Sequence, residues 1–184
     1  MNKLKNSLTY IAGPIDNCAS WEDANDWRDD ITEFLRDLNI GVMNPCNKPS
    51  GDEESPSLAG DVRALKRERA YDEASAVMKE ICRVDLRMVS KSDFLIAHLD
   101  MSINMCGTFH EIVQAKMNRI PVLIHCEQGK SEIPNWLFGT CDHKDMFSCW
   151  DDLKTRIIGI DSGEIKVDTK HWHFFDNNKI FGKV

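Results

Sequence analysis

Apolar and polar positions follow two different patterns along the first two thirds of the chain. Short and almost continuous apolar runs predict buried strands, at residues 8–12, 41–43, 94–97 and 121–124. Between these runs, apolar side chains recur at helical spacing within residues 20–38 and 74–88, and in a segment that opens near residue 107. Strands that alternate with helices predict right-handed crossovers and a parallel sheet with helices on both faces.

Two regions fit this alternation less well. Residues 47–70 are rich in Pro, Ser, Gly and charged side chains without a lasting apolar period, so we expect a long loop or surface insertion there. Residues 128–184 are expected to form a C-terminal extension with a short strand at 146–147, a helix at 150–160 and an aromatic tail. Residues 1–184 as a whole are predicted to form a single α/β domain of the flavodoxin or Rossmann type, a three-layer sandwich around a mostly parallel sheet of about five strands.

Composition narrows the class of protein. The chain has 184 residues, of which 42% are hydrophobic, which suits one packed domain. A net charge of -7 argues against binding to a nucleic-acid polymer, because neutralising phosphates needs a basic surface. No run approaches the ~18 apolar residues of a membrane span, so no membrane partner is expected. The 7 cysteines are odd in number and form no C-x-x-C pair, which indicates reduced thiols and a cytoplasmic protein.

Four acidic residues lie near predicted strand ends or helix starts, where ligands of parallel α/β folds bind: Asp16, Asp85, Asp93 and Glu111. We expect Glu111 in the first turn of its helix, where the macrodipole keeps a carboxylate ionised. An ionised carboxylate can attack a sugar C1' while a second carboxyl group, here Asp85, handles the proton of the leaving group. Charge spacing alone leaves a second interpretation open, in which Glu111 complements the helix dipole and Asp85 lies on a solvated helix face.

Three short motifs occur in a defined order. Thr9-Tyr10-Ile11-Ala12-Gly13-Pro14-Ile15 ends the first strand, Val84-Asp85-Leu86 precedes Ser92-Asp93 and a strand, and Gly107-Thr108-Phe109-His110-Glu111-Ile112 precedes Ala115. In this order, over about residues 7 to 125, the chain resembles the nucleoside 2-deoxyribosyltransferase family, which includes the deoxynucleoside 5'-monophosphate N-glycosidases. The resemblance implies a small-molecule nucleoside or nucleotide and a nucleobase as ligands, no cofactor or metal, and a homo-oligomer.

The resemblance also implies roles for individual residues. Glu111 would be the nucleophile that forms a glycosyl ester, Asp85 the acid or base near the leaving nucleobase, and Tyr10 the residue that orients nucleophile and sugar. On sequence grounds alone, Tyr10 is equally well explained as a core aromatic residue. The remaining substrate-binding residues would be Gly13, Pro14, Ile15, Asp16, Asp93, Asn104, Met105, Cys106, Gly107 and Thr108.

Met105 departs from the family pattern. Six residues before the nucleophile, the transferases carry an aspartate that binds the 5'-hydroxyl and the monophosphate hydrolases a serine, whereas this chain has Met105. Asn104, Ser102 and Cys106 are the nearby candidates for that role. Three functions therefore stay open: transfer of a deoxyribosyl group between bases, hydrolysis of nucleoside 5'-monophosphates, and a non-catalytic nucleotide-binding module.

Three further residue patterns are assigned no catalytic or metal-binding role. His110 is expected to point away from the pocket, because adjacent helical residues do not share a face. Cys106 has no recognisable base partner and is expected to be a packing residue. His171 and His173 lack the further ligands that a metal site needs, so no metal is predicted there.

Overall fold

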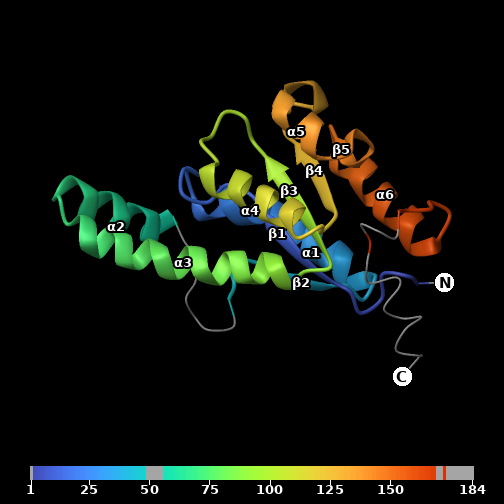
Figure 1. Cartoon of the computed structure of the whole chain (residues 1–184), viewed down its shortest axis with the longest axis horizontal. Coiled ribbons are helices and arrows are strands. Elements are labelled where there is room, and N and C mark those ends of the chain that lie inside the picture. Colours follow the sequence, from blue (N-terminus) through green and yellow to red (C-terminus); the bar gives the residue numbers. More distant parts are fainter. Residues whose placement is uncertain (1, 49–55, 169–171, 173–184) are drawn as a thin grey trace.

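A computed structural model describes residues 2–48, 56–168 and 172 of the chain. Its sheet has five strands, namely β1 (Leu8–Ala12), β2 (Gly41–Met43), β3 (Phe94–Leu99), β4 (Val122–Cys126) and β5 (Met146–Phe147). The helices are α1 (Trp21–Asp37), α2 (Pro56–Arg67), α3 (Tyr71–Lys91), α4 (Cys106–Met117), α5 (Asn135–Thr140) and α6 (Trp150–Ser162), with short 3-10 turns at Lys130–Glu132 and His143–Asp145. All strand pairs are parallel, in the order β2-β1-β3-β4-β5. The predicted parallel α/β fold is therefore confirmed (Figure 1).

Helices cover both faces of the sheet because successive side chains of a strand point to opposite faces. Leu95 and Ala97 of β3 pack with Val89 of α3 and with Ile112 and Ala115 of α4. On the other face, Phe94 and Ile96 pack with α1 and α6. The helix residues of that second core cluster include Ile31, Leu35, Leu153 and Ile157. The two clusters make the three layers that the sequence pattern predicts.

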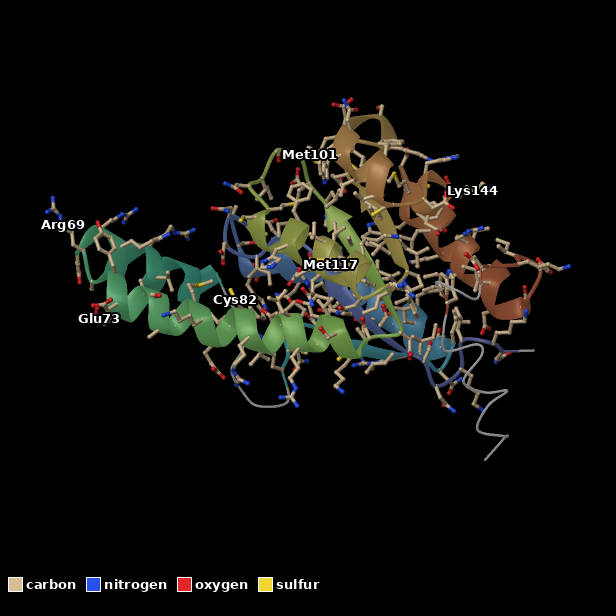
Figure 2. The ribbon with its side chains drawn as sticks, in the orientation of Figure 1. Arg69, Glu73, Cys82, Met101, Met117 and Lys144 are labelled. Carbon is tan, nitrogen blue, oxygen red and sulfur yellow. The ribbon has the colours of Figure 1, made fainter. Side chains whose placement is uncertain are left out.

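The loop expected at residues 47–70 is partly wrong, because α2 lies within it. Val62 is buried and Leu65, one helical turn later, is half-buried, so α2 has a short apolar side that packs on α3. Pro56 suits the first turn of a helix, where its missing N–H is not needed. The apolar period was hidden because it extends over so few residues between charged side chains. In Figure 2 this α2–α3 hairpin projects beyond the sheet, with Arg69 and Glu73 at its tip and Cys82 nearer the sheet.

The order of the strands creates a crevice between β1 and β3. The chain continues from β1 to β2 on one side and from β3 to β4 on the other, so the connections leave the ends of β1 and β3 in opposite directions. Such a topological switch point is where open parallel sheets bind ligands, at the carboxyl ends of the strands. The turn after Ala12 and the loop after Leu99 meet there, since Asn17 Nδ2 donates a hydrogen bond to the Asn104 carbonyl over 2.8 Å.

The C-terminal part adds to the same sheet. The strand β5 pairs with β4, and α6 packs on the face opposite α4. Trp172 is buried against Phe94, with 5.7 Å between the ring centroids, whereas Phe174, Phe175 and Phe181 of the expected aromatic tail lie outside the described residues. Within the described residues, no helix has the length and apolar character needed to cross a membrane.

Candidate active site

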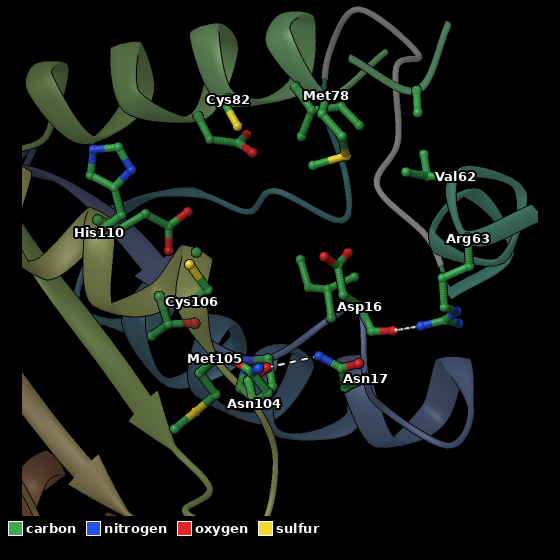
Figure 3. A pocket seen from close by; sticks show the side chains of 18 of the residues that line it. Asp16, Asn17, Val62, Arg63, Met78, Cys82, Asn104, Met105, Cys106 and His110 are labelled. Carbon is green, nitrogen blue, oxygen red and sulfur yellow. Dashed lines mark hydrogen bonds between the residues drawn. The ribbon is translucent and has the colours of Figure 1, made fainter. Parts of the chain in front are cut away.

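A cavity of about 590 Å³ opens at the switch point. Its walls come from the turn after β1, from α2, from the first two thirds of α3 and from the start of α4 (Figure 3). Of the residues predicted to bind substrate, the lining includes Gly13, Pro14, Ile15, Asp16, Asn104, Met105, Cys106, Gly107 and Thr108. Asp85 and Glu111 line it as well. Segments that are far apart in the sequence are thus brought to one cavity, as the motif order suggested.

Glu111 lies on the cavity wall and is fixed by a tyrosine. The Tyr10 hydroxyl donates a hydrogen bond to Glu111 Oε1 over 2.6 Å, and Tyr10 itself is fully buried in β1. A hydrogen bond from a hydroxyl to a carboxylate at this distance belongs to the strong, charge-assisted class. Because α4 begins at Cys106, Glu111 lies in its second turn, and the expected first-turn position is wrong. The Tyr10 hydroxyl therefore orients this carboxylate, which lies beyond the first turn of the helix.

Asp85 forms a buried ion pair that the sequence did not indicate. Lys48 Nζ lies 2.8 Å from Asp85 Oδ1, and the side chains are 2% and 8% exposed. Asp85 belongs to α3, whereas Lys48 follows β2 at the start of the segment that was expected to be a loop. Buried lysines are rare unless paired, so this contact compensates two charges that are removed from water. No periodic or motif signal in the sequence singles out Lys48.

The side chain of Met105 belongs to the core. It is 3% exposed, packs in the cluster between the sheet and α4, and its sulfur accepts a hydrogen bond from the Asp100 N–H at 3.3 Å. Figure 3 shows it directed toward the strands, away from Asp16 and His110. A thioether has no hydrogen-bond donor and is only a weak acceptor, whereas the resemblance implies a polar side chain at this position. Any polar reader of the substrate must therefore come from elsewhere in the cavity.

Two basic residues line the cavity from α2. Arg63 and Lys66 belong to the lining, and Arg63 Nη1 donates a hydrogen bond to the backbone carbonyl of Asp16. In Figure 3, Arg63 lies beside Asp16, on the opposite side of the cavity from His110. These cations were missed because residues 47–70 were expected to be a loop. Their spacing of three residues within a charged run was the available signal.

Two expectations about the start of α4 are wrong. His110 is exposed and lines the cavity, although it was expected to point away from it. Cys106 was expected to pack in the core and is exposed, but it lies in the cavity lining, where its predicted substrate-binding role requires it to be. The physical reason is that α3 lies beside α4 and the cavity extends along both helices, so a wide sector of α4 faces the cavity.

Asp93 lies outside the cavity, which corrects the expectation that it borders the pocket. It precedes β3, and its Oδ2 accepts a hydrogen bond from the Leu8 N–H over 2.8 Å. In a parallel sheet all strands start at one end of the sheet and finish at the other. The cavity lies at the carboxyl ends of the strands, whereas Asp93 lies at their starts. Burial raises the pKa of this carboxyl group above its usual range, and the backbone hydrogen bond from Leu8 lowers it. Its observed role is to connect the starts of two strands.

The turn after β1 is held by a buried arginine that no sequence motif singles out. Arg28 of α1 is fully buried and donates hydrogen bonds to the carbonyls of Gly13, at 2.9 Å, and Pro14, at 3.3 Å. Trp27 packs so closely on Gly13 that a Cβ there would lie 2.5 Å from the indole ring. A larger residue at position 13 would therefore displace the wall of the cavity.

The strand order and the position of the cavity define a flavodoxin-like α/β protein in which three acidic residues, Asp16, Asp85 and Glu111, line the crevice at the switch point. A solved 2-deoxyribosyltransferase from Bacillus psychrosaccharolyticus is similar to it, with a TM-score of 0.53, 16% sequence identity, and coverage of 80% of this chain and 90% of that one. At this identity the similarity establishes the fold, which agrees with the resemblance of the motifs.

Two further solved structures align less closely. A CMP N-glycosidase from Clostridium botulinum has 13% identity and a TM-score of 0.46, and covers 82% of this chain and 98% of its own. A conserved protein from Enterococcus faecalis has 18% identity and a TM-score of 0.44, with coverage of 96% and 99%. The sequence matches no family model and no curated protein.

Proposed function

We propose that the protein cleaves the N-glycosidic bond of 2'-deoxynucleosides or 2'-deoxynucleotides, with Glu111 as the nucleophile. The observation that carries this proposal is the 2.6 Å hydrogen bond from Tyr10 to Glu111, which holds a carboxylate at the wall of a cavity that a second carboxylate, Asp85, also lines. Two carboxyl groups with different surroundings are what a retaining glycosidic cleavage requires. The resemblance of the motifs assigns the same two residues.

The proposed reaction has two halves. The Glu111 carboxylate, which Tyr10 orients, attacks the anomeric carbon and forms a glycosyl ester as the bond to the base nitrogen breaks. The departing base takes a proton that passes from the Lys48 ammonium through the Asp85 carboxylate, which lines the cavity. In the second half, another nucleobase attacks the ester and returns its proton to the pair. The net result is transfer of the deoxyribosyl group between bases.

Hydrolysis of 2'-deoxynucleoside 5'-monophosphates is the second candidate, and Arg63 and Lys66 favour it. A phosphate group in the cavity would accept charge-assisted hydrogen bonds from these two side chains, whereas an uncharged nucleoside offers them no anionic group. In this version water attacks the glycosyl ester, the Lys48–Asp85 pair accepts one proton of that water, and the products are a free base and the sugar phosphate.

Product analysis tests the proposal. Purified protein is incubated with each deoxynucleoside and each deoxynucleoside monophosphate, with and without a competing free base, and the products are separated by chromatography with mass detection. New nucleosides or nucleotides establish transfer, and free sugar or sugar phosphate alone establishes hydrolysis. Ligand-induced stabilisation without any product, from all substrates, would contradict the proposal and indicate the non-catalytic binding module.

The expected homo-oligomer stays a prediction. Members of the family that this chain resembles complete each pocket with residues of a neighbouring subunit. In this chain, residues of α2 and α3 line the cavity, and the α2–α3 hairpin projects beyond the sheet (Figure 1). Light scattering at micromolar concentration is expected to give at least a dimer, and a monomer that turns over substrate would overturn this expectation.

A further inference from the structure

Two histidines face each other on the side of the sheet opposite the cavity helices. His98 of β3 and His125 of β4 are register partners in adjacent parallel strands, so their side chains leave the sheet on the same face. Glu127 follows His125 by two residues, which returns it to that face, and its N–H continues the pairing by donating to the Leu99 carbonyl over 2.8 Å. One ligand atom from each of the three residues lies within 4.8 Å of the others.

The distance between the two rings suits a shared metal ion. The Nδ1 atoms of His98 and His125 are 2.9 Å apart. An ion at the usual metal–nitrogen distance of about 2.0–2.1 Å from both would see them at an angle of about 90°, the cis angle of an octahedral or square-pyramidal site. His98 and His125 are buried, whereas Glu127 is exposed and has the freedom to move its carboxylate onto the third position.

The histidine pair is shielded from solvent by aromatic side chains. The indole ring of Trp150 stacks on His125 with 4.2 Å between centroids, and Trp27 lies 4.8 Å from His98. An aromatic shell of this kind limits solvent access to a metal centre. Burial lowers the pKa of His98 to about 3 and that of His125 to about 4.

The nearby charges are mixed. The Asp100 carboxylate and the Arg28 guanidinium both act on His98, with opposite signs. Glu127 supplies the negative charge that a divalent ion needs from its own ligands. Two imidazoles and one carboxylate form the ligand set typical of Zn²⁺, Fe²⁺, Co²⁺ or Ni²⁺, and not of Ca²⁺ or Mg²⁺, which prefer oxygen ligands only.

We propose that His98, His125 and Glu127 bind one divalent transition-metal ion. The ion would join the carboxyl ends of β3 and β4 behind the cavity. Trp27 connects the site to the cavity wall, because it packs both on His98 and on Gly13. None of the three residues lines the cavity, so the ion would have a structural role and take no part in the glycosidic reaction. The competing arrangement is a neutral histidine pair joined by one N–H···N hydrogen bond, which also fits 2.9 Å.

Metal titration separates the two arrangements. Chelator-treated, dialysed protein is titrated with Zn²⁺ by calorimetry and with Co²⁺ by visible absorption. The proposal predicts one ion per chain, a Co²⁺ spectrum without thiolate charge-transfer bands, and a higher melting temperature with Zn²⁺. His125→Phe, which keeps an aromatic ring for the stack, and Glu127→Gln are each expected to weaken binding at least about tenfold.

Controls address the other groups that bind metals. His143→Phe removes an exposed histidine, and the double variant His171→Phe/His173→Phe removes the histidine pair near the C-terminus; both are expected to bind Zn²⁺ as the unmodified protein does. Glu127 is exposed, so Glu127→Gln tests the site even where His125→Phe does not fold. Absence of saturable binding, unchanged affinity in Glu127→Gln, or thiolate bands that assign the ion to cysteines would each overturn the proposal.

Discussion

The two sides of the cavity come from different parts of the fold. Tyr10 belongs to strand β1, whereas Glu111 and Asp85 belong to α4 and to the C-terminal half of α3, which pack directly on the sheet. Arg63 and Lys66 belong to α2, which packs on α3 beyond the sheet. The difference suggests that the core positions the groups that react, while the peripheral hairpin supplies groups that choose among substrates. Changes on the first side should therefore affect every substrate, and changes on the second side only anionic ones.

Removing the nucleophile is expected to have the largest effect. Glu111→Gln keeps an acceptor for the Tyr10 hydroxyl but cannot form the glycosyl ester, so base release should fall at least about 10³-fold for nucleosides and nucleotides alike. Chromatographic rates on both substrate classes provide the measurement. Glu132→Gln, an exposed acid outside the cavity, is the matched control and should retain the full rate.

Breaking the buried ion pair should destabilise the protein. Lys48→Met leaves the Asp85 carboxylate buried without its cation, and we expect the free energy of unfolding to drop by about 3 kcal/mol in urea denaturation. Lys144→Met, at an exposed lysine, should change stability little. The double variant Lys48→Met/Asp85→Leu should recover part of the loss, whereas additive losses would show that the pair does not interact.

Tyr10→Phe tests how much the Tyr10 hydroxyl contributes to the reaction rate by orienting Glu111. It removes one hydrogen bond to a carboxylate, a contribution of roughly 1.5–3 kcal/mol, so kcat should fall about 10- to 100-fold for all substrates. Steady-state kinetics on a nucleoside and on its monophosphate provide the measurement. A change in KM alone, or an effect on one substrate class only, would be inconsistent with an orienting role toward Glu111.

The cationic side should affect phosphorylated substrates alone. Lys66→Gln and Arg63→Gln are each expected to raise KM for a deoxynucleoside monophosphate about tenfold, because each removes a charge-assisted hydrogen bond to phosphate. KM for the matching nucleoside should stay nearly constant. Arg67→Gln, on the same helix but outside the cavity lining, is the control. Equal increases in KM for the nucleoside and for its monophosphate would contradict phosphate binding by Arg63 and Lys66.

The smallest effect is expected at Asp93, which lies at the start of β3, at the end of the sheet away from the cavity. Asp93→Asn keeps an oxygen that accepts from the Leu8 N–H, so kcat and KM should change by less than about twofold. A loss of activity comparable to that of Tyr10→Phe, with stability unchanged, would mean that this residue reaches the substrate after all.

The sheet and the reactive side of the cavity were predictable because they depend on local patterns. Apolar runs such as residues 94–97 and 121–124 indicate strands without any information about the rest of the fold. The carboxyl ends of parallel strands then lie at the same end of the sheet, which places the cavity. The motif from Gly107 to Ile112 also marks the helix that carries Glu111. Cys106 and His110 were assigned wrongly because the width of the cavity depends on how α3 and α4 pack, which no local pattern reports.

The rest of the site depends on contacts between distant segments. The partner of Asp85 is Lys48, which lies 37 positions away, and the buried charge appears in the sequence as an ordinary lysine beside a polar stretch. The helix α2 has only a brief apolar period, so its cations were read as part of a loop. The His98–His125 pair depends on strand register, which was not predicted.

Rapid acid quench during turnover, followed by intact-mass analysis and peptide mapping, tests the central claim most directly. The account predicts a covalent adduct of one deoxyribosyl group, or of its 5-phosphate, on the peptide that contains Glu111, and no adduct in Glu111→Gln. An adduct on another residue, or undiminished base release by Glu111→Gln, would contradict it.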